Sequence, residues 1–154
     1  MLETTLAYVT VVLAAVLTLA ACVLLQYEGL LAIWRLLSAH GGHRRIKVLY
    51  GIGSVILLHV IEIWLFGIAL WLLLLWPACG GLAGQDSYGM LDYVYFSAVT
   101  FSTVGFGDLS PVGAIRFFSA TEALAGFVLI TWSASFTYLE MERFWRIDDL
   151  DEGK

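Results

Sequence analysis

Residues 100–108 of the chain read TFSTVGFGD. Gly105 and Gly107 each follow a bulky apolar residue in this stretch. Glycine adopts left-handed backbone conformations that other residues avoid. When every second residue can do so, successive backbone carbonyls can point to one side of the chain while the bulky side chains point to the other. We therefore expect a loop whose carbonyl oxygens form a row of cation ligands.

The loop is embedded in a strongly apolar chain. Apolar residues make up 60% of the 154 residues and charged residues only 14%, and the mean hydropathy is +0.86. A soluble domain carries about 25% charged residues. Three apolar stretches, which end near residues 37, 76 and 139, are each long enough to cross a bilayer, a length of about 20 residues. The sequence therefore predicts an integral membrane protein. It has no basic stripe, so we expect no nucleic-acid partner.

The segment between the second and third stretches is neither apolar throughout nor simply polar. Residues 90–101 are rich in aromatic side chains and long enough for a short helix, and the glycine-containing loop follows them directly. Non-helical backbone at membrane depth is tolerated only where protein buries it or where it lines a water-filled cavity. We therefore predict a re-entrant element, in which a short helix and its loop enter the membrane between two spanning helices.

The cationic residues predict the orientation of the chain. Four of the 8 Lys and Arg residues flank the polar link that follows the first stretch, and three follow the third stretch. Only Arg116 lies on the other side. Because cytoplasmic loops carry an excess of Lys and Arg, we expect the link and the C-terminus in the cytoplasm. The N-terminus and residues 77–111 are then expected outside.

The segment Thr103–Asp108 resembles the selectivity filter of potassium channels, in which backbone carbonyls replace the hydration shell of the ion. The likeness extends over about residues 48–144. Tyr95 and Phe96 resemble the aromatic pair of the pore helix of that family. The chain is similar to small bacterial pore-loop potassium channels of the ion-channel-domain, or two-pore-domain-like, family.

The resemblance implies a division of the chain into four parts. They are an extra N-terminal transmembrane helix at 1–37, a cytoplasmic link at 38–47, a pore domain at 48–142 and a short cytoplasmic tail at 143–154. Within the pore domain it implies an outer helix at 48–77, a pore helix at 90–101, a filter at 103–107 and an inner helix at 112–140. Because each chain has one filter and the family closes a ring of four, a homotetramer is implied.

The implied fold class is an all-α integral membrane protein with three transmembrane helices and a re-entrant pore helix, located in the cell inner (plasma) membrane. The implied function is passive, potassium-selective conduction, without a catalysed reaction and without an organic cofactor. The partners are K⁺, the lipid bilayer and three further copies of the chain. Asp108 closes the outer mouth. The filter residues are Thr103, Val104, Gly105, Phe106 and Gly107, of which the first four bind K⁺ through their carbonyls and the threonine hydroxyl.

Two positions depart from the family pattern. Phe106 stands where the filter commonly has tyrosine, and this removes a phenol that braces the filter. Val99 stands where related channels often carry a carboxylate that pairs with the aspartate of the outer mouth, so Asp108 needs another partner. These departures leave a weakly selective cation channel open as an alternative. A second alternative, from a different class, is a non-conducting regulatory or sensor subunit that keeps the fold.

Ionisable residues inside the apolar stretches are candidate gating residues, because such groups are costly in a membrane. His59 and Glu62 share a helix face at a spacing of three, and Arg116 lies about two turns outward of Glu122. Protonation of these groups would change how the outer and inner helices pack. The alternative is a structural polar contact, with Glu122 bonded to the back of the pore helix. Gly126 falls where the resemblance places a hinge glycine, and the alternative role for it is close helix packing.

The remaining candidate ligands are few. The pair at positions 59 and 62 supplies only two metal ligands, so we expect no metal site besides the K⁺ sites. Cys22 is expected to be buried in the first helix. Cys79 follows Pro77 in the outer loop, where it is either a free thiol or part of a disulfide between neighbouring chains in an oxidising compartment.

Overall fold

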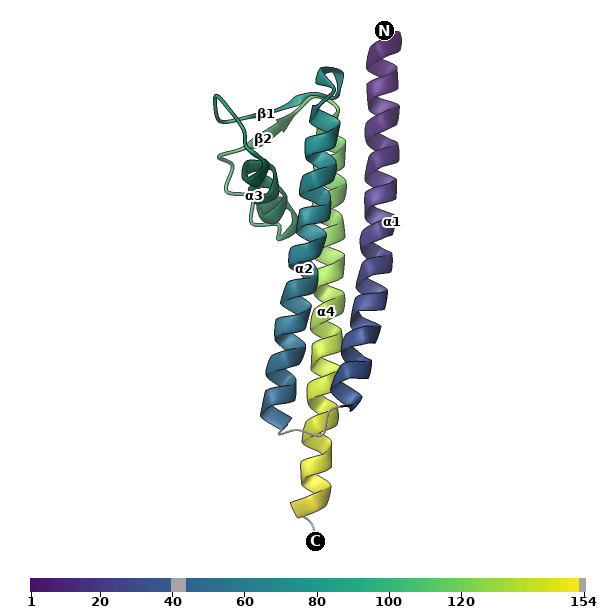
Figure 1. Cartoon of the computed structure of the whole chain (residues 1–154), viewed down its shortest axis with the longest axis vertical. Helices are drawn as coiled ribbons and strands as arrows, with labels where there is room; N and C mark the ends of the chain where they lie inside the picture. The colour runs from purple at the N-terminus through teal and green to yellow at the C-terminus, as the bar shows by residue number, and fades with distance from the viewer. Residues whose placement is uncertain (40–43, 153–154) are drawn as a thin grey trace.

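The computed structural model describes residues 1–39 and 44–152, and it is mostly helical (Figure 1). Its elements, in chain order, are α1 (Leu2–Ala39), α2 (Arg44–Leu74), the 3₁₀ helix η1 (Pro77–Cys79), β1 (Gly81–Ala83), α3 (Met90–Phe101), β2 (Ser110–Val112) and α4 (Ile115–Glu152). Residues 40–43 of the link and 153–154 of the tail lie outside the described residues.

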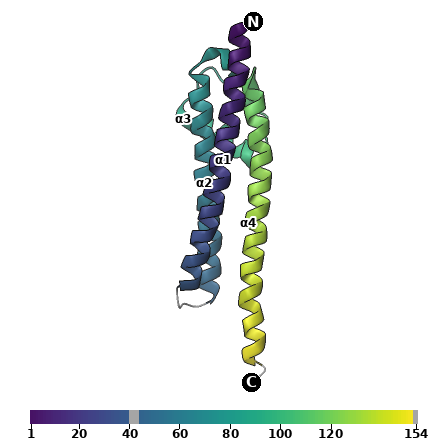
Figure 2. The same cartoon turned by 90° about the vertical axis from the view of Figure 1, so that its right-hand side faces the viewer.

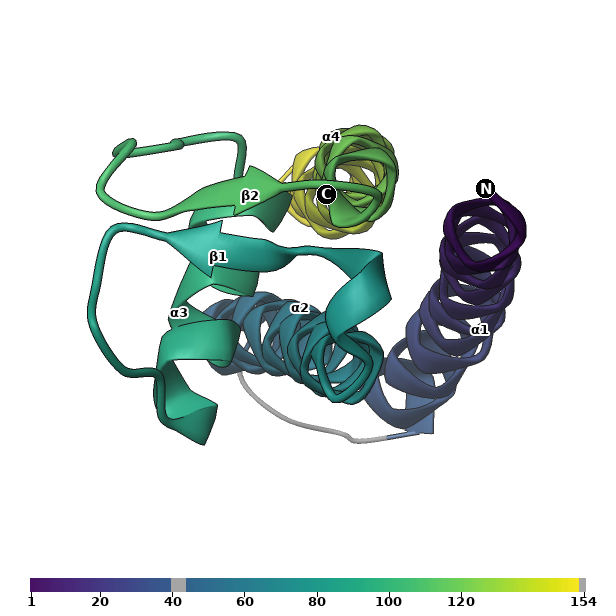
Figure 3. The same ribbon diagram turned by 90° about the horizontal axis from the view of Figure 1, so that it is seen from above.

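Three long helices lie side by side, and the short elements gather at one end of them (Figures 1 and 2). The segments Leu2–Ser38, Ile46–Leu74 and Ile115–Glu142 are each long and apolar enough to cross a membrane. The prediction of a largely helical protein with three helices able to cross a membrane is thereby confirmed. Viewed from above, α2 and α4 lie between α1 on one side and α3 on the other (Figure 3).

The fold also contains a small antiparallel sheet. Strand β1 pairs with β2, with Gly81 opposite Val112 and Ala83 opposite Ser110. The strands approach each other so closely at Gly80 that an added Cβ would lie 1.9 Å from the carbonyl oxygen of Val112. The expectation of an all-α fold is wrong in this detail, because three-residue strands are too short to produce a visible alternating pattern.

Several helix ends differ from those expected. Helix α2 ends at Leu74 rather than at 77, because Pro77 begins a separate 3₁₀ turn. Helix α4 begins at Ile115 rather than at 112, because β2 precedes it and Gly113 has a φ of +83°. At its other end, α4 continues through Glu152, so the segment expected as a separate short tail begins as helix.

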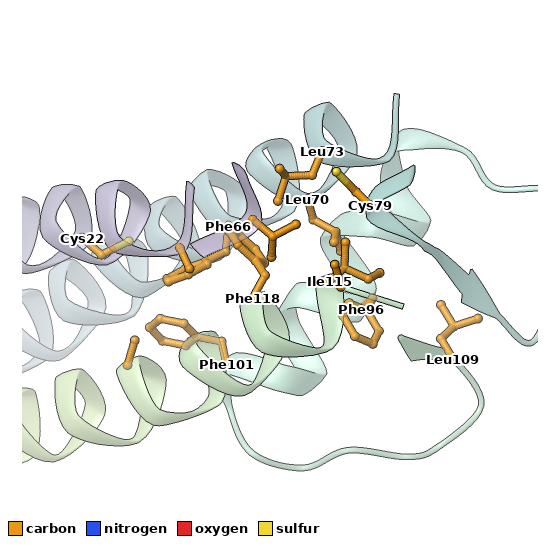
Figure 4. Packing of buried hydrophobic residues seen from close by; sticks show 14 of the residues in the cluster. Cys22, Phe66, Leu70, Leu73, Cys79, Phe96, Phe101, Leu109, Ile115 and Phe118 are labelled. Atoms are coloured by element: carbon orange, nitrogen blue, oxygen red, sulfur yellow. The ribbon is translucent and has the colours of Figure 1, made fainter. Parts of the chain in front are cut away.

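The core forms where α2, α3 and α4 meet. The ring of Phe66 lies 6.2 Å from that of Phe101 and 5.6 Å from that of Phe118, so one aromatic cluster joins the three helices (Figure 4). Small buried residues of α1, among them Ala7 and Ala15, pack against the same core. Small side chains allow helices to approach closely in lipid. Helix α1 therefore packs within its own chain, on the side of α2 and α4 away from α3 (Figure 3).

Candidate ion-conduction site

Helix α3 carries the candidate filter and is held at its start by a cap. Gly89 N donates a hydrogen bond to Asp92 Oδ2 at 2.7 Å, which satisfies one amide just before the first turn. The helix then packs tightly on α2, because an added Cβ at Gly67 would lie 3.0 Å from Val94 Cα. The close approach to α2 fixes the position from which the following loop leaves α3.

The loop after α3 has an alternating backbone. Positive φ values occur at Thr103 (+60°), Gly105 (+53°) and Gly107 (+81°). Thr103 N donates to Thr100 O at 2.9 Å, and Gly105 N donates to Val99 O at 3.0 Å, so the loop folds back on the end of its own helix. A left-handed residue at every second position is the conformation that permits successive carbonyls to face one side.

The two bulky side chains of the loop are uncovered. Val104 is 56% exposed and Phe106 is 70% exposed in the single chain. Beside the loop lies an open pocket of about 420 Å³ between α3, the loop and the first turns of α4. Arg116 lines this pocket together with Thr103 and Gly107, and its side chain is exposed. Arg116 therefore belongs to the surface around the loop.

Asp108 finds its partner on α3. Tyr95 Oη donates a hydrogen bond to Asp108 Oδ2 at 2.8 Å. This hydrogen bond is the main reason why the pKa of the Tyr95 phenol is raised above its usual value. Val99, which stands where a carboxylate was expected, is a buried apolar residue. The sequence predicted that Asp108 needs another partner, but a tyrosine within a helix gave no signal that it would be that partner.

His59 and Glu62 form a hydrogen-bonded pair on α2, in which His59 is partly buried. His59 Nδ1 lies 2.8 Å from Glu62 Oε2, and the glutamate side chain is fully buried. The imidazole also packs against the last residue of α3, with its ring centroid 5.9 Å from that of Phe101. The pair therefore touches the end of the helix that carries the loop.

Glu122 lies on α4 and contacts α3. Its side chain is fully buried on α4, and its Oε1 is hydrogen-bonded to Ser97 Oγ of α3. The same hydroxyl lies 2.8 Å from Ile63 O of α2. The structure thus brings Glu122 to the back of α3 and does not pair it with Arg116. Sequence reasoning missed Ser97, because a serine in a helix carries no pattern of its own.

Gly126 is a point of close contact within a continuous helix. An added Cβ at Gly126 would lie 1.9 Å from the carbonyl oxygen of Phe101, the last residue of α3. Of the two roles considered for this glycine, close packing is the one for which the structure gives a reason. Helix α4 therefore supports α3 at two levels, once at Glu122 and once at Gly126.

A further buried polar contact joins α1 to α4. Gln26 Nε2 donates to Ser133 Oγ at 2.7 Å and to Leu129 O at 3.2 Å. Gln26 is fully buried, and its Oε1 has no hydrogen-bond partner. In the sequence, this contact is indicated only by the amide of Gln26 at the end of a long apolar stretch.

No cluster of three or more metal-ligating side chains occurs among the residues that the structure describes. Cys22 and Cys79 are both free and fully buried. Burial raises the pKa of the Cys79 thiol. A disulfide between Cys79 of neighbouring chains is incompatible with this conformation, because Cys79 belongs to the buried core cluster and is not at the surface (Figure 4).

Two curated proteins are similar to part of the chain. Protein LctB of Geobacillus stearothermophilus is 31% identical over 67 residues, which cover 44% of this chain and 50% of the relative. Protein LctB of Bacillus caldotenax is 38% identical over 48 residues, which cover 30% of this chain and 36% of the relative. The chain thus spans half the length of these relatives or less. No solved structure matches the chain.

A family model gives the wider match. The model described as "Ion channel" matches residues 47–142, which is more than half of the chain. The matched region contains α3, its loop and the helical segments of α2 and α4 that hold them. The chain therefore belongs to the ion channel family.

Proposed function

We propose that the chain forms a potassium-selective channel that conducts K⁺ passively. The observation that carries this proposal is the alternating left-handed backbone at Thr103, Gly105 and Gly107, directly after a short helix in a chain of the ion channel family. The carbonyls of residues 103–106 and the Thr103 hydroxyl would replace water around the ion. The C-terminal end of α3 is partially negative and leads into this loop, which further favours a cation there.

The proposed conducting unit contains four chains. One chain supplies one loop, and a row of carbonyls on one strand does not surround an ion. Four loops related by cyclic symmetry would close the ring. The exposure of Val104 (56%) and Phe106 (70%) supports this assembly, because large apolar side chains beside a filter need a cover. Neighbouring copies would provide that cover.

We place this channel in the cell inner (plasma) membrane, with the N-terminus and the β1–β2 sheet outside and the C-terminus in the cytoplasm. The distribution of Lys and Arg in the sequence supports this orientation. Asp108 then lies at the outer mouth, where Tyr95 holds its carboxylate. The channel binds K⁺ and lipid, and we propose no catalysed reaction and no organic cofactor for it.

The test is ion flux from liposomes that contain the purified protein, with K⁺ or Na⁺ gradients and with Ba²⁺ as the blocker. The key variant is Gly105→Ala. An added Cβ at Gly105 meets no atom within 4 Å, but the φ of +53° is strained for alanine, so the change acts on the loop conformation. Gly53→Ala is the matched control, because a Cβ there also meets nothing and the backbone is helical.

We expect Ba²⁺-sensitive K⁺ flux in the wild type and in Gly53→Ala, and its loss in Gly105→Ala. Equal Na⁺ and K⁺ flux would replace the proposal with a weakly selective cation channel, which the lack of a hydroxyl on Phe106 favours. An absence of flux over a range of pH would favour a non-conducting regulatory or sensor subunit. We further propose that protonation of the His59–Glu62 pair modulates conduction through the contact of His59 with Phe101.

A further inference from the structure

One hydroxyl group joins three helices behind the loop. Ser97 Oγ of α3 lies 2.8 Å from Ile63 O of α2 and is also hydrogen-bonded to Glu122 Oε1 of α4. Ser97 and Glu122 are both fully buried. Ser97 lies one turn before Phe101, the residue at which α3 ends and the chain turns into the loop.

The hydrogen atoms at this junction can be counted. A serine hydroxyl has a single proton to donate, and a backbone carbonyl only accepts. When Ser97 donates to Ile63 O, the contact between Ser97 and Glu122 needs a proton that comes from the carboxyl group. A protonated carboxyl group has one such O–H donor. Both contacts are therefore hydrogen bonds at the same time only if Glu122 is a neutral acid.

The surroundings of Glu122 agree with a neutral side chain. Cys22 of α1 interacts electrostatically with both Glu122 and Glu62 of α2, and α3 contributes Ser97. Among the described side chains no cation forms an ion pair with Glu122, and Arg116 of its own helix is exposed. Glu122 Oε2 has no hydrogen-bond partner. A buried carboxylate with one empty oxygen and no cation would be costly.

We propose that Glu122 is a protonated positioning residue, which donates a hydrogen bond to Ser97 while Ser97 donates one to Ile63 O. This chain of hydrogen bonds holds α3 and its loop between α2 and α4. Loss of the proton would redirect the Ser97 hydroxyl to the carboxylate and would release Ile63 O. The link to α2 would then be lost, although α3 would stay bonded to α4. The effect on the loop rests on the proposed channel function, whereas the protonation of Glu122 does not.

Infrared spectroscopy of the full chain in lipid vesicles tests the protonation directly. We expect a C=O stretching band of a protonated carboxylic acid that disappears in Glu122→Gln and persists in the matched control Glu62→Gln. Ser97→Ala leaves the acid in place without its acceptor, so the band should shift to higher frequency. A spectrum of Glu122→Gln that equals the wild-type spectrum in this region would overturn the proposal, and this readout needs no ion flux.

The positioning role has a separate readout in the K⁺ over Na⁺ selectivity of vesicle flux. Glu122→Gln keeps a neutral donor for Ser97, while Glu122→Met has a similar shape and no donor. We expect Gln to preserve selectivity better than Met, with Ser97→Ala behaving like Met. Equal selectivity of the two Glu122 variants would refute the positioning role. An absence of flux in the wild type would instead refute the channel proposal and leave the infrared result standing.

Discussion

At the scale of single residues, the glycines of this chain have two different structural roles. Gly105 and Gly107 have positive φ, and a Cβ added there would meet no other atom, so their role is to allow a left-handed backbone. Gly126 is helical, and its missing side chain leaves room for the carbonyl of Phe101. A sequence pattern identifies the first kind, because alternation is visible along the chain. It does not identify the second kind, because the neighbour comes from another helix.

Gly126→Ala is expected to destabilise the protein. The added Cβ would lie 1.9 Å from Phe101 O, so α3 or α4 must move. Overpacking of this kind costs about 1–3 kcal/mol. Thermal unfolding in detergent measures the change, with Gly53→Ala as the control, since nothing lies within 4 Å of a Cβ there. A Gly126→Ala protein that melts at the wild-type temperature would show that the two helices do not pack this closely.

The polar contacts mark the limit of sequence-based prediction at this scale. The pair of His59 and Glu62 was expected from its spacing of three, and the two atoms lie 2.8 Å apart. The partners Tyr95, Ser97 and Gln26 were not expected in these roles. Each is a single polar residue within a helix, and its partner lies on a different segment of the chain. Only tertiary packing creates these contacts, so no local pattern precedes them.

At the scale of elements, composition predicted the long helices better than their ends. Apolar stretches of sufficient length become α1, α2 and α4 whatever follows them, because a spanning segment must satisfy its backbone internally. The ends depend on neighbours. Helix α4 begins after the expected residue 112 because residues 110–112 pair with β1. Strand β1 precedes α3 in the chain. The sheet thus joins the segment before α3 to the segment after the loop, and short strands of this kind leave no periodic signal.

Helix α2 carries the contact through which pH is expected to act. The imidazole of His59 lies against Phe101 at the end of α3, and Glu62 lies beside it. We expect the pH dependence of K⁺ flux to be much weaker in His59→Ala than in the wild type. His43→Ala, in the polar link by sequence, is the control. A His59→Ala profile with the wild-type slope would contradict a role for this helix in pH response.

At the scale of the whole molecule, the arrangement of helices indicates where neighbouring copies would sit. The loop and α3 lie on one side of α2 and α4, and α1 lies on the other (Figure 3). An axis that brings four loops together must therefore pass on the α3 side. Helix α1 would then lie at the periphery, where its exposed apolar side chains face lipid. The extra helix widens each subunit without entering the proposed ring.

This geometry predicts which apolar residue stabilises a tetramer. Phe106 is 70% exposed beside the loop, and Leu17 is 69% exposed on α1, so the two side chains are equally uncovered in one chain. A neighbouring copy would cover only Phe106. Truncation of a well-covered aromatic residue at an interface costs about 2 kcal/mol or more. Native mass measurement in detergent should give four copies of the 17.0 kDa chain for the wild type and for Leu17→Ala, with smaller species in Phe106→Ala. If Leu17→Ala dissociates instead, α1 forms the interface and the axis lies on its side.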